Sequence, residues 1–193
     1  MKPLVLTMGD PAGIGLEITC QAWSDRHRLG LPAFVLIGDP DAVAERARAC
    51  RLDTPIVILD KVAQAAAGFG ERLPVLPVRL PAPSRPGHPD AANAAAVIAS
   101  IETAVAAVCD GEAAAVVTNP IAKSVLYQAG FTHPGHTEFL AALAERHMPG
   151  RRYHPVMMLV SNALRVVPLT VHIPISAVPA AINRPLIVAT VQV

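Results

Sequence analysis

The stretch Leu4-Val-Leu-Thr-Met-Gly-Asp-Pro-Ala-Gly-Ile-Gly15 passes directly from a short apolar run into a glycine-rich turn. A helix is expected after it, over residues 16–26, and the same succession of apolar run, turn and helix returns at residues 33–49 and 113–129. Strands that alternate with helices are typical of α/β folds with a mostly parallel sheet. Such sheets bind ligands at the carboxyl ends of their strands. The turns that follow the strands are therefore where a functional site is expected.

The rest of the chain continues this pattern, with one loop that stands out. Further strands are expected at residues 55–59 and 73–78, a long alanine-rich helix at 91–108, a helix at 138–147, and two adjacent strands at 156–160 and 164–171. Asp39 or Asp41 is expected to cap the helix that follows the second strand. Residues 81–89 contain four prolines, so this segment is expected to be a loop and is a candidate subdomain boundary near residues 81–90.

Composition excludes several classes of function. The 193 residues carry a net charge of only +1, which gives no basis for binding nucleic acid or a charged membrane surface. The three cysteines form no C-x-x-C pair, which argues against a disulfide framework and suits a reducing cytoplasm. The longest uncharged stretch, residues 166–183, contains three prolines, so a membrane-spanning helix is not expected there.

Two turns carry candidate anion-binding groups. The glycines of residues 9–15 would let backbone N–H groups approach an anion, but the spacing is neither G-x-G-x-x-G nor a Walker pattern, so a structural turn is favoured. Thr118-Asn-Pro-Ile-Ala-Lys123 follows an apolar run and opens a helix. Lys123 offers a point charge to a carboxylate or phosphate, and a solvated lysine on a helix face is an equal alternative.

Histidines supply the remaining candidates. His133-Pro-Gly-His136-Thr137 precedes a helical segment, where Thr137 is expected to be the N-cap and His136 to lie near free backbone N–H groups. His172 is expected at the carboxyl end of an apolar strand, and its imidazole is a good ligand for a divalent metal. A three-histidine hydrolase site built from His133, His136 and His172 is an alternative, although the first two lack the spacing that puts both on one helix face.

Several of these segments recur in one family in the same order. They are Met8-Gly-Asp-Pro-Ala-Gly-Ile-Gly15, Thr118-Asn-Pro-Ile-Ala-Lys123, Pro134-Gly-His-Thr-Glu-Phe-Leu140, Met157-Met-Leu159 and Thr170-Val-His-Ile-Pro174. With them, the chain resembles the 4-hydroxythreonine-4-phosphate dehydrogenase family of pyridoxal phosphate biosynthesis from Leu4 to Val193. The resemblance implies a two-domain α/β subunit related to isocitrate and isopropylmalate dehydrogenases, a mostly parallel sheet, and homodimers.

The resemblance also implies an activity and site residues. The family oxidises the C3 hydroxyl of 4-phosphooxy-L-threonine with NAD or NADP, and decarboxylation then gives 3-amino-2-oxopropyl phosphate. His136 and Thr137 match its substrate-binding pair, and His172 matches its first metal ligand, for zinc, magnesium or cobalt. Asn119 and Lys123 match a recurrent motif without an assigned role.

The chain departs from the family in its length. The other two metal histidines and further substrate-binding residues of the family come from downstream segments that this chain lacks. We therefore expect residues 1–193 to be the N-terminal portion of such an enzyme, inactive alone because one histidine cannot hold a catalytic metal. Related dehydrogenases of 4-phospho-threonate, 4-phospho-erythronate or a dihydrodiol dicarboxylate remain alternatives, as does a non-catalytic remnant.

Overall fold

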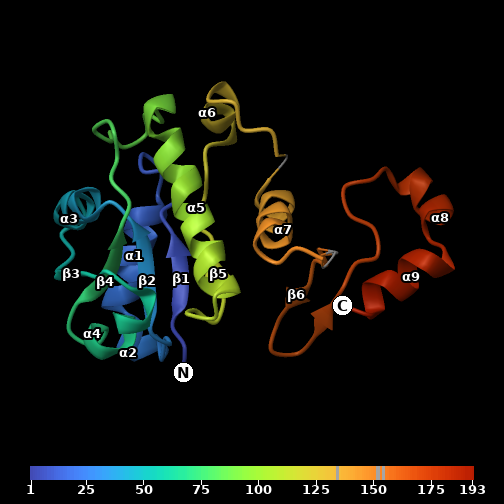
Figure 1. Cartoon of the computed structure of the whole chain (residues 1–193), viewed down its shortest axis with the longest axis horizontal. Helices are drawn as coiled ribbons and strands as arrows, with labels where there is room; N and C mark the ends of the chain where they lie inside the picture. Colours follow the sequence, from blue (N-terminus) through green and yellow to red (C-terminus); the bar gives the residue numbers. More distant parts are fainter. Residues whose placement is uncertain (134, 151–152, 154) are drawn as a thin grey trace. The chain divides into compact units, whose positions relative to one another are not determined.

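A computed structural model describes residues 1–133, 135–150, 153 and 155–193 (Figure 1). The chain divides into two compact units, Met1–Met148 and Pro149–Val193. The segment near residues 81–90, which the sequence marks as a candidate boundary, lies inside the first unit. The division that the structure shows falls after Met148.

The first unit is built on a five-stranded parallel sheet, as the alternation of strands and helices predicts (Figure 1). Its strands, in the order β3-β4-β2-β1-β5, are β1 (Leu4–Thr7), β2 (Phe34–Gly38), β3 (Ile56–Ile58), β4 (Leu73–Pro77) and β5 (Val116–Val117). In the central pair, Leu4 is opposite Phe34 and Thr7 is opposite Ile37. Because every pair is parallel, the carboxyl ends of all five strands meet at one edge.

Helices bury both faces of this sheet, which explains why its strands are apolar throughout rather than alternating. Leu6 and Leu36 share one apolar cluster with Leu16 and Val43 from the helices that follow β1 and β2. Val5 and Val35 belong to the opposite cluster. The helical segments of this unit are α1 (Gly15–Ser24), α2 (Arg26–Leu29), α3 (Pro40–Ala49), η1 (Val62–Gln64), α4 (Ala65–Gly68), η2 (Ala91–Asn93), α5 (Ala94–Cys109), α6 (Lys123–Gln128) and α7 (His136–His147).

The longest helical segment, Ala91–Cys109, is long and apolar enough to cross a membrane by length and composition alone. Its apolar side chains have a partner within the fold, because Ile101 and Ala104 are fully buried and α5 lies against β1 and β2. Helix α7 packs in turn on α5, where Arg146 Nη2 donates to Glu102 Oε1 at 2.9 Å. This segment is therefore a core helix of the α/β unit.

Over its described residues, the second unit contains a short antiparallel hairpin and three helical segments. They are β6 (Leu159–Val160), β7 (Arg165–Val166), η3 (Ile175–Ala177), α8 (Val178–Ala181) and α9 (Arg184–Val191). The two strands are much shorter than expected. Between them Ser161 turns the chain, and its Oγ accepts hydrogen bonds from the N–H groups of Ala163 and Leu164. Most apolar side chains of this unit are exposed, and Ile175 retains 90% of its accessible surface.

Candidate functional site

The glycine-rich turn after β1 packs against the exit of β5. Gly9 has a φ of +70°, and a Cβ atom added to it would lie 2.6 Å from the carbonyl oxygen of Pro120. A Cβ atom on Gly15 would lie 2.9 Å from Cβ of Asn119. Both glycines are therefore required because the two turns approach closely. This favours the structural interpretation of the turn.

Asn119 holds these two turns together. Its side-chain Nδ2 donates to the carbonyl oxygen of Thr7 at 2.9 Å and to Oγ1 of Thr19 at 3.0 Å. Its own N–H group donates to Oγ1 of Thr7 at 3.2 Å, and the N–H group of Asp10 donates to the carbonyl oxygen of Pro120 at 2.8 Å. Asn119 is buried, so the structure gives this member of the second motif a structural role.

Arg46 supports the same turn from helix α3. Its guanidinium donates to the carbonyl oxygens of Pro11 and Gly13, both at 3.1 Å, and to Oε1 of Glu17 at 2.7 Å. Because Arg46 is buried and satisfied within the protein, it is a structural cation. The sequence offers no signal for this role, since Arg46 is one of several arginines in a polar segment.

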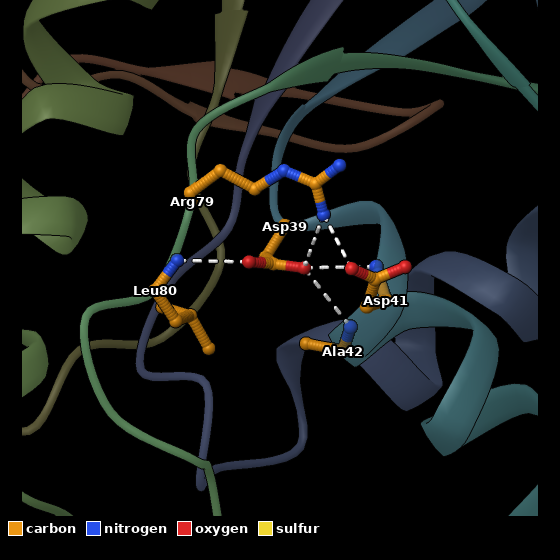
Figure 2. Close-up of polar contacts among 5 residues, drawn as sticks. All are labelled: Asp39, Asp41, Ala42, Arg79 and Leu80. Carbon is orange, nitrogen blue, oxygen red and sulfur yellow. Dashed lines mark hydrogen bonds and ion pairs between the residues drawn. The ribbon is translucent and has the colours of Figure 1, made fainter.

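The end of β2 is organised by Asp39, which caps helix α3 as the sequence predicts (Figure 2). Oδ1 of Asp39 accepts from the N–H groups of Asp41 at 2.8 Å and Ala42 at 3.2 Å, and Oδ2 accepts from the N–H group of Leu80 at 2.8 Å. Nη1 of Arg79 forms an ion pair with Oδ2 of Asp41 at 2.5 Å and lies 3.6 Å from Oδ1 of Asp39. One carboxylate thus joins the exits of β2 and β4.

The loop of residues 81–90 continues along this edge. The N–H group of Gly87 donates to the carbonyl oxygen of Ala12 at 2.8 Å, which fastens the loop to the glycine-rich turn. The loop borders an open hollow of about 480 Å³, lined by Ala82, Pro83, Arg85, His88, Pro89 and Asp90. Sequence reasoning missed this hollow because the proline content indicated only irregular structure.

The candidate substrate-binding pair lies at the start of α7. Gly135 is the N-cap, and it has no side chain with which to cap this helix end. The expectation that Thr137 is the N-cap is wrong: the backbone is already helical at His136, so exposed Thr137 is the second helical residue. His136 is half-buried, and its Nε2 atom is buried without a hydrogen-bond partner among the described residues. Burial, and after it the nearby positive charge of Lys123, lower the pKa of His136, which favours a neutral imidazole at pH 7.

Lys123, the first residue of α6, reaches this helix start. A Cβ atom added to Gly135 would lie 3.5 Å from Nζ of Lys123 and 3.3 Å from Oε2 of Glu138. The amine is therefore beside the first turn of α7, together with His136. The structure thus brings Lys123 and His136 together, although the sequence placed them in separate motifs.

His133 belongs to an aromatic cluster under this site. Its ring centroid lies 5.4 Å from that of Phe131 and 4.9 Å from that of Phe139, and the two phenylalanines meet edge to face at 5.0 Å. These contacts favour a packing role for His133. Pro134, which is part of the family motif, lies outside the described residues.

The candidate metal ligand His172 lies in the second unit. The expectation that it ends a strand is wrong, since β7 ends at Val166 and His172 occupies an exposed bend with a φ of +57°. A positive φ is uncommon for a residue other than glycine, and such strained positions cluster at functional sites. Among the described residues, no group of three or more His, Cys, Asp or Glu side chains could hold a metal ion. The described residues therefore do not form a complete metal site.

Comparisons with known proteins agree on one family. Residues 31–193 match the family model described as pyridoxal phosphate biosynthetic protein PdxA. The chain is 51% identical to a 4-hydroxythreonine-4-phosphate dehydrogenase of Xanthobacter autotrophicus, over 97% of this chain and 53% of the relative. It is also 51% identical to the protein of that name from Bradyrhizobium diazoefficiens, over 100% of this chain and 57% of the relative.

Solved structures show the same relationship. A 4-hydroxythreonine-4-phosphate dehydrogenase from Burkholderia phymatum aligns with a TM-score of 0.85 at 27% identity, over 100% of this chain and 56% of that one. A terephthalate 1,2-cis-dihydrodiol dehydrogenase from Burkholderia xenovorans aligns with a TM-score of 0.64 at 25% identity, over 99% of this chain and 55% of that one. The chain spans about half the length of the curated relatives it matches, and over that span it belongs to the PdxA family of pyridoxal phosphate biosynthetic proteins.

Proposed function

We propose that this chain is part of an NAD(P)-dependent dehydrogenase that oxidises 4-phosphooxy-L-threonine at its C3 hydroxyl group. A hydride passes to the nicotinamide and a proton is released, and the resulting β-keto acid loses carbon dioxide to give 3-amino-2-oxopropyl phosphate. The observation that carries this proposal is the family match over residues 31–193. The relatives that bear this name and are half identical to the chain support it.

In this proposal, His136 and Thr137 bind the substrate. A neutral imidazole with a buried, unpartnered nitrogen has a free capacity for one hydrogen bond. The Thr137 hydroxyl is exposed beside the first turn of a twelve-residue helix, whose N–H groups favour an anionic group. These properties suit the recognition of a small phosphorylated hydroxy amino acid.

The family implies a nicotinamide cofactor, and we propose NAD or NADP. We also propose that His172 contributes one ligand to a divalent zinc, magnesium or cobalt ion. Because the described residues do not form a complete metal site, no step of the reaction is derived through that ion. A cytoplasmic homodimer with the two-domain architecture of isocitrate and isopropylmalate dehydrogenases completes the proposal.

Related substrates form a second candidate. The similarity to a dihydrodiol dehydrogenase from Burkholderia xenovorans favours this alternative, which also includes 4-phospho-threonate and 4-phospho-erythronate. The TM-score for that protein is 0.64, against 0.85 for the Burkholderia phymatum enzyme. The comparison therefore favours 4-phosphooxy-L-threonine. A non-catalytic remnant is the third alternative.

A chimeric enzyme tests the proposal. Residues 1–193 would replace the matching part of the Xanthobacter autotrophicus relative, and initial rates of NADH and NADPH formation would be measured with each candidate substrate. We expect the highest kcat/KM for 4-phosphooxy-L-threonine. His136→Ala removes the imidazole and should lower kcat/KM at least about a hundredfold. The variant loses a contact with the substrate and, with it, a group that orients the substrate.

The 193-residue chain alone and a His27→Ala chimera are the controls. We expect no turnover by the chain alone, and an unchanged rate for His27→Ala because His27 lies in α2, outside the proposed site. A clear preference for a phospho-threonate or a dihydrodiol would refute the substrate assignment. A folded chimera without activity on any of these substrates would favour the non-catalytic remnant.

A further inference from the structure

Lys123 is held in a fixed position relative to the start of α7. Helix α6 is anchored by Leu126, which is buried, and the N–H group of Phe131 donates to the carbonyl oxygen of Leu126 at 3.0 Å. Phe131 then meets Phe139 of α7 edge to face at 5.0 Å. Because these buried contacts couple the two helices, the reach of Lys123 to Gly135 follows from the packing of the fold.

The ammonium group of Lys123 forms no ion pair with another described residue. Glu138 is an acidic group beside the same glycine, since a Cβ atom on Gly135 would lie 3.3 Å from its Oε2 and 3.5 Å from Nζ of Lys123. Even so, none of the ion pairs between described residues includes Lys123 or Glu138. A simple pairing of Lys123 with Glu138 therefore does not account for the position of the amine.

Three groups that can bind an anion lie at this helix start. They are the ammonium group of Lys123, which forms no ion pair with another described residue, the buried Nε2 of His136, and the first N–H groups of α7 behind the N-cap Gly135. A cation, an imidazole in the tautomer that carries its proton on Nε2, and helix N–H groups together match the oxygens of a phosphate group. A carboxylate presents fewer oxygens and less charge, so the same groups would bind it more weakly.

We propose that Lys123 is a substrate-positioning residue whose ammonium group pairs with the phosphate of the substrate, beside His136 and Thr137. This inference rests on the proposed function, because it assigns a third residue to the same binding site. It gives a role to the lysine of the Thr118–Lys123 motif and accounts for the proximity of that motif to the start of α7. Asn119 of the same motif anchors the turn behind it.

Binding of inorganic phosphate to the 193-residue chain tests this inference, with the imidazole resonances of His136 as the readout in NMR titrations. We expect saturable shifts with phosphate and weaker binding of acetate. Lys123→Met should weaken phosphate binding about tenfold, as the loss of one hydrogen bond between charged groups would. Lys123→Arg should retain most of the affinity. Lys2→Met removes the same charge before β1, at the opposite edge of the sheet, and should change the affinity less than about twofold.

The pKa of His136 supplies a second readout, which reports whether the charge of Lys123 lies beside the imidazole. Lys123→Met should raise this pKa toward its ordinary value, because a neighbouring positive charge is lost. Lys123→Arg should leave the pKa lowered. An unchanged His136 pKa in Lys123→Met would overturn the inference, provided that the amide spectrum shows a folded chain.

The titrations also separate this inference from the proposed function. If phosphate shifts His136 in the unmodified chain and binds equally well to Lys123→Met, the role of Lys123 is wrong and the site of His136 and Thr137 stands. If phosphate leaves the His136 resonances of the unmodified chain unchanged, the inference is wrong, and the substrate assignment is then decided by the chimeric enzyme alone.

Discussion

Asn119 shows how one buried amide can join distant parts of a sequence. Its partners Thr7 and Thr19 precede it by 112 and 100 residues. The sequence marks Asn119 as part of a motif, but the motif alone does not distinguish a ligand contact from a structural one. The role becomes visible only when β1, α1 and the exit of β5 are adjacent in space.

Removal of this amide should destabilise the first unit. Asn119→Ala leaves the carbonyl oxygen of Thr7 and Oγ1 of Thr19 without their donor in a buried place. We expect the free energy of unfolding to fall by about 3 kcal/mol in urea denaturation, because buried polar groups without partners carry their full desolvation cost.

Asn162→Ala is the matched control, because Asn162 is exposed and its loss should change the free energy of unfolding by less than about 0.5 kcal/mol. Equal stability of the two variants would show that the Asn119 network contributes nothing net.

The sequence predicts a helix or strand correctly where neighbouring residues alone determine it. The apolar run of residues 4–7 and the capping carboxylate of Asp39 both predict the observed elements β1 and α3. Helix α7 begins earlier than predicted, because an extended Gly135 forms the N-cap in place of Thr137. Glycine carries no side chain to signal that role, so this helix start could not be located from residue types alone.

The cap of α3 offers a test with an internal control (Figure 2). Asp39→Ala removes the acceptor for two N–H groups of α3 and for the N–H group of Leu80. We expect a loss of about 2 kcal/mol in the free energy of unfolding, at the upper end of the range for helix caps.

The neighbouring Asp41→Ala removes a carboxylate whose side chain is 88% exposed. Its pairing with Arg79 should contribute less than about 1 kcal/mol, as exposed ion pairs do. Both variants would be measured by urea denaturation followed by circular dichroism. A larger loss for Asp41→Ala than for Asp39→Ala would contradict the assigned roles.

At the scale of the whole chain, the alternation of strands and helices predicts the parallel sheet. The order of the strands within that sheet could not be predicted from the sequence. Strand β3 pairs with β4, and β4 separates it from β2. Every strand is apolar on both faces, so periodicity gives no information about which strands are neighbours. The division after Met148 falls directly before the pair Pro149-Gly150, a turn signal in the sequence that was not interpreted as a boundary.

The two units should differ sharply in local stability, which hydrogen exchange measures. Val5 and Val35 are fully buried, so the amides of β1 and β2 should exchange only through global unfolding. Leu159 and Val160 are 58% and 65% exposed, so the amides of β6 should exchange at least about a thousandfold faster than those of β1.

The dependence of this exchange on protein concentration then tests the proposed homodimer. A second copy that covers the exposed apolar side chains of residues 149–193 would bury their backbone and slow exchange in β6 and β7 as the concentration rises. Protection of these strands that does not change over a hundredfold range of concentration, while size-exclusion chromatography shows a monomer throughout that range, would exclude a second copy as its source. Protection equal to that of β1 at every concentration would contradict the exposed second unit itself, because a unit whose apolar side chains face solvent has too little buried surface to resist local opening.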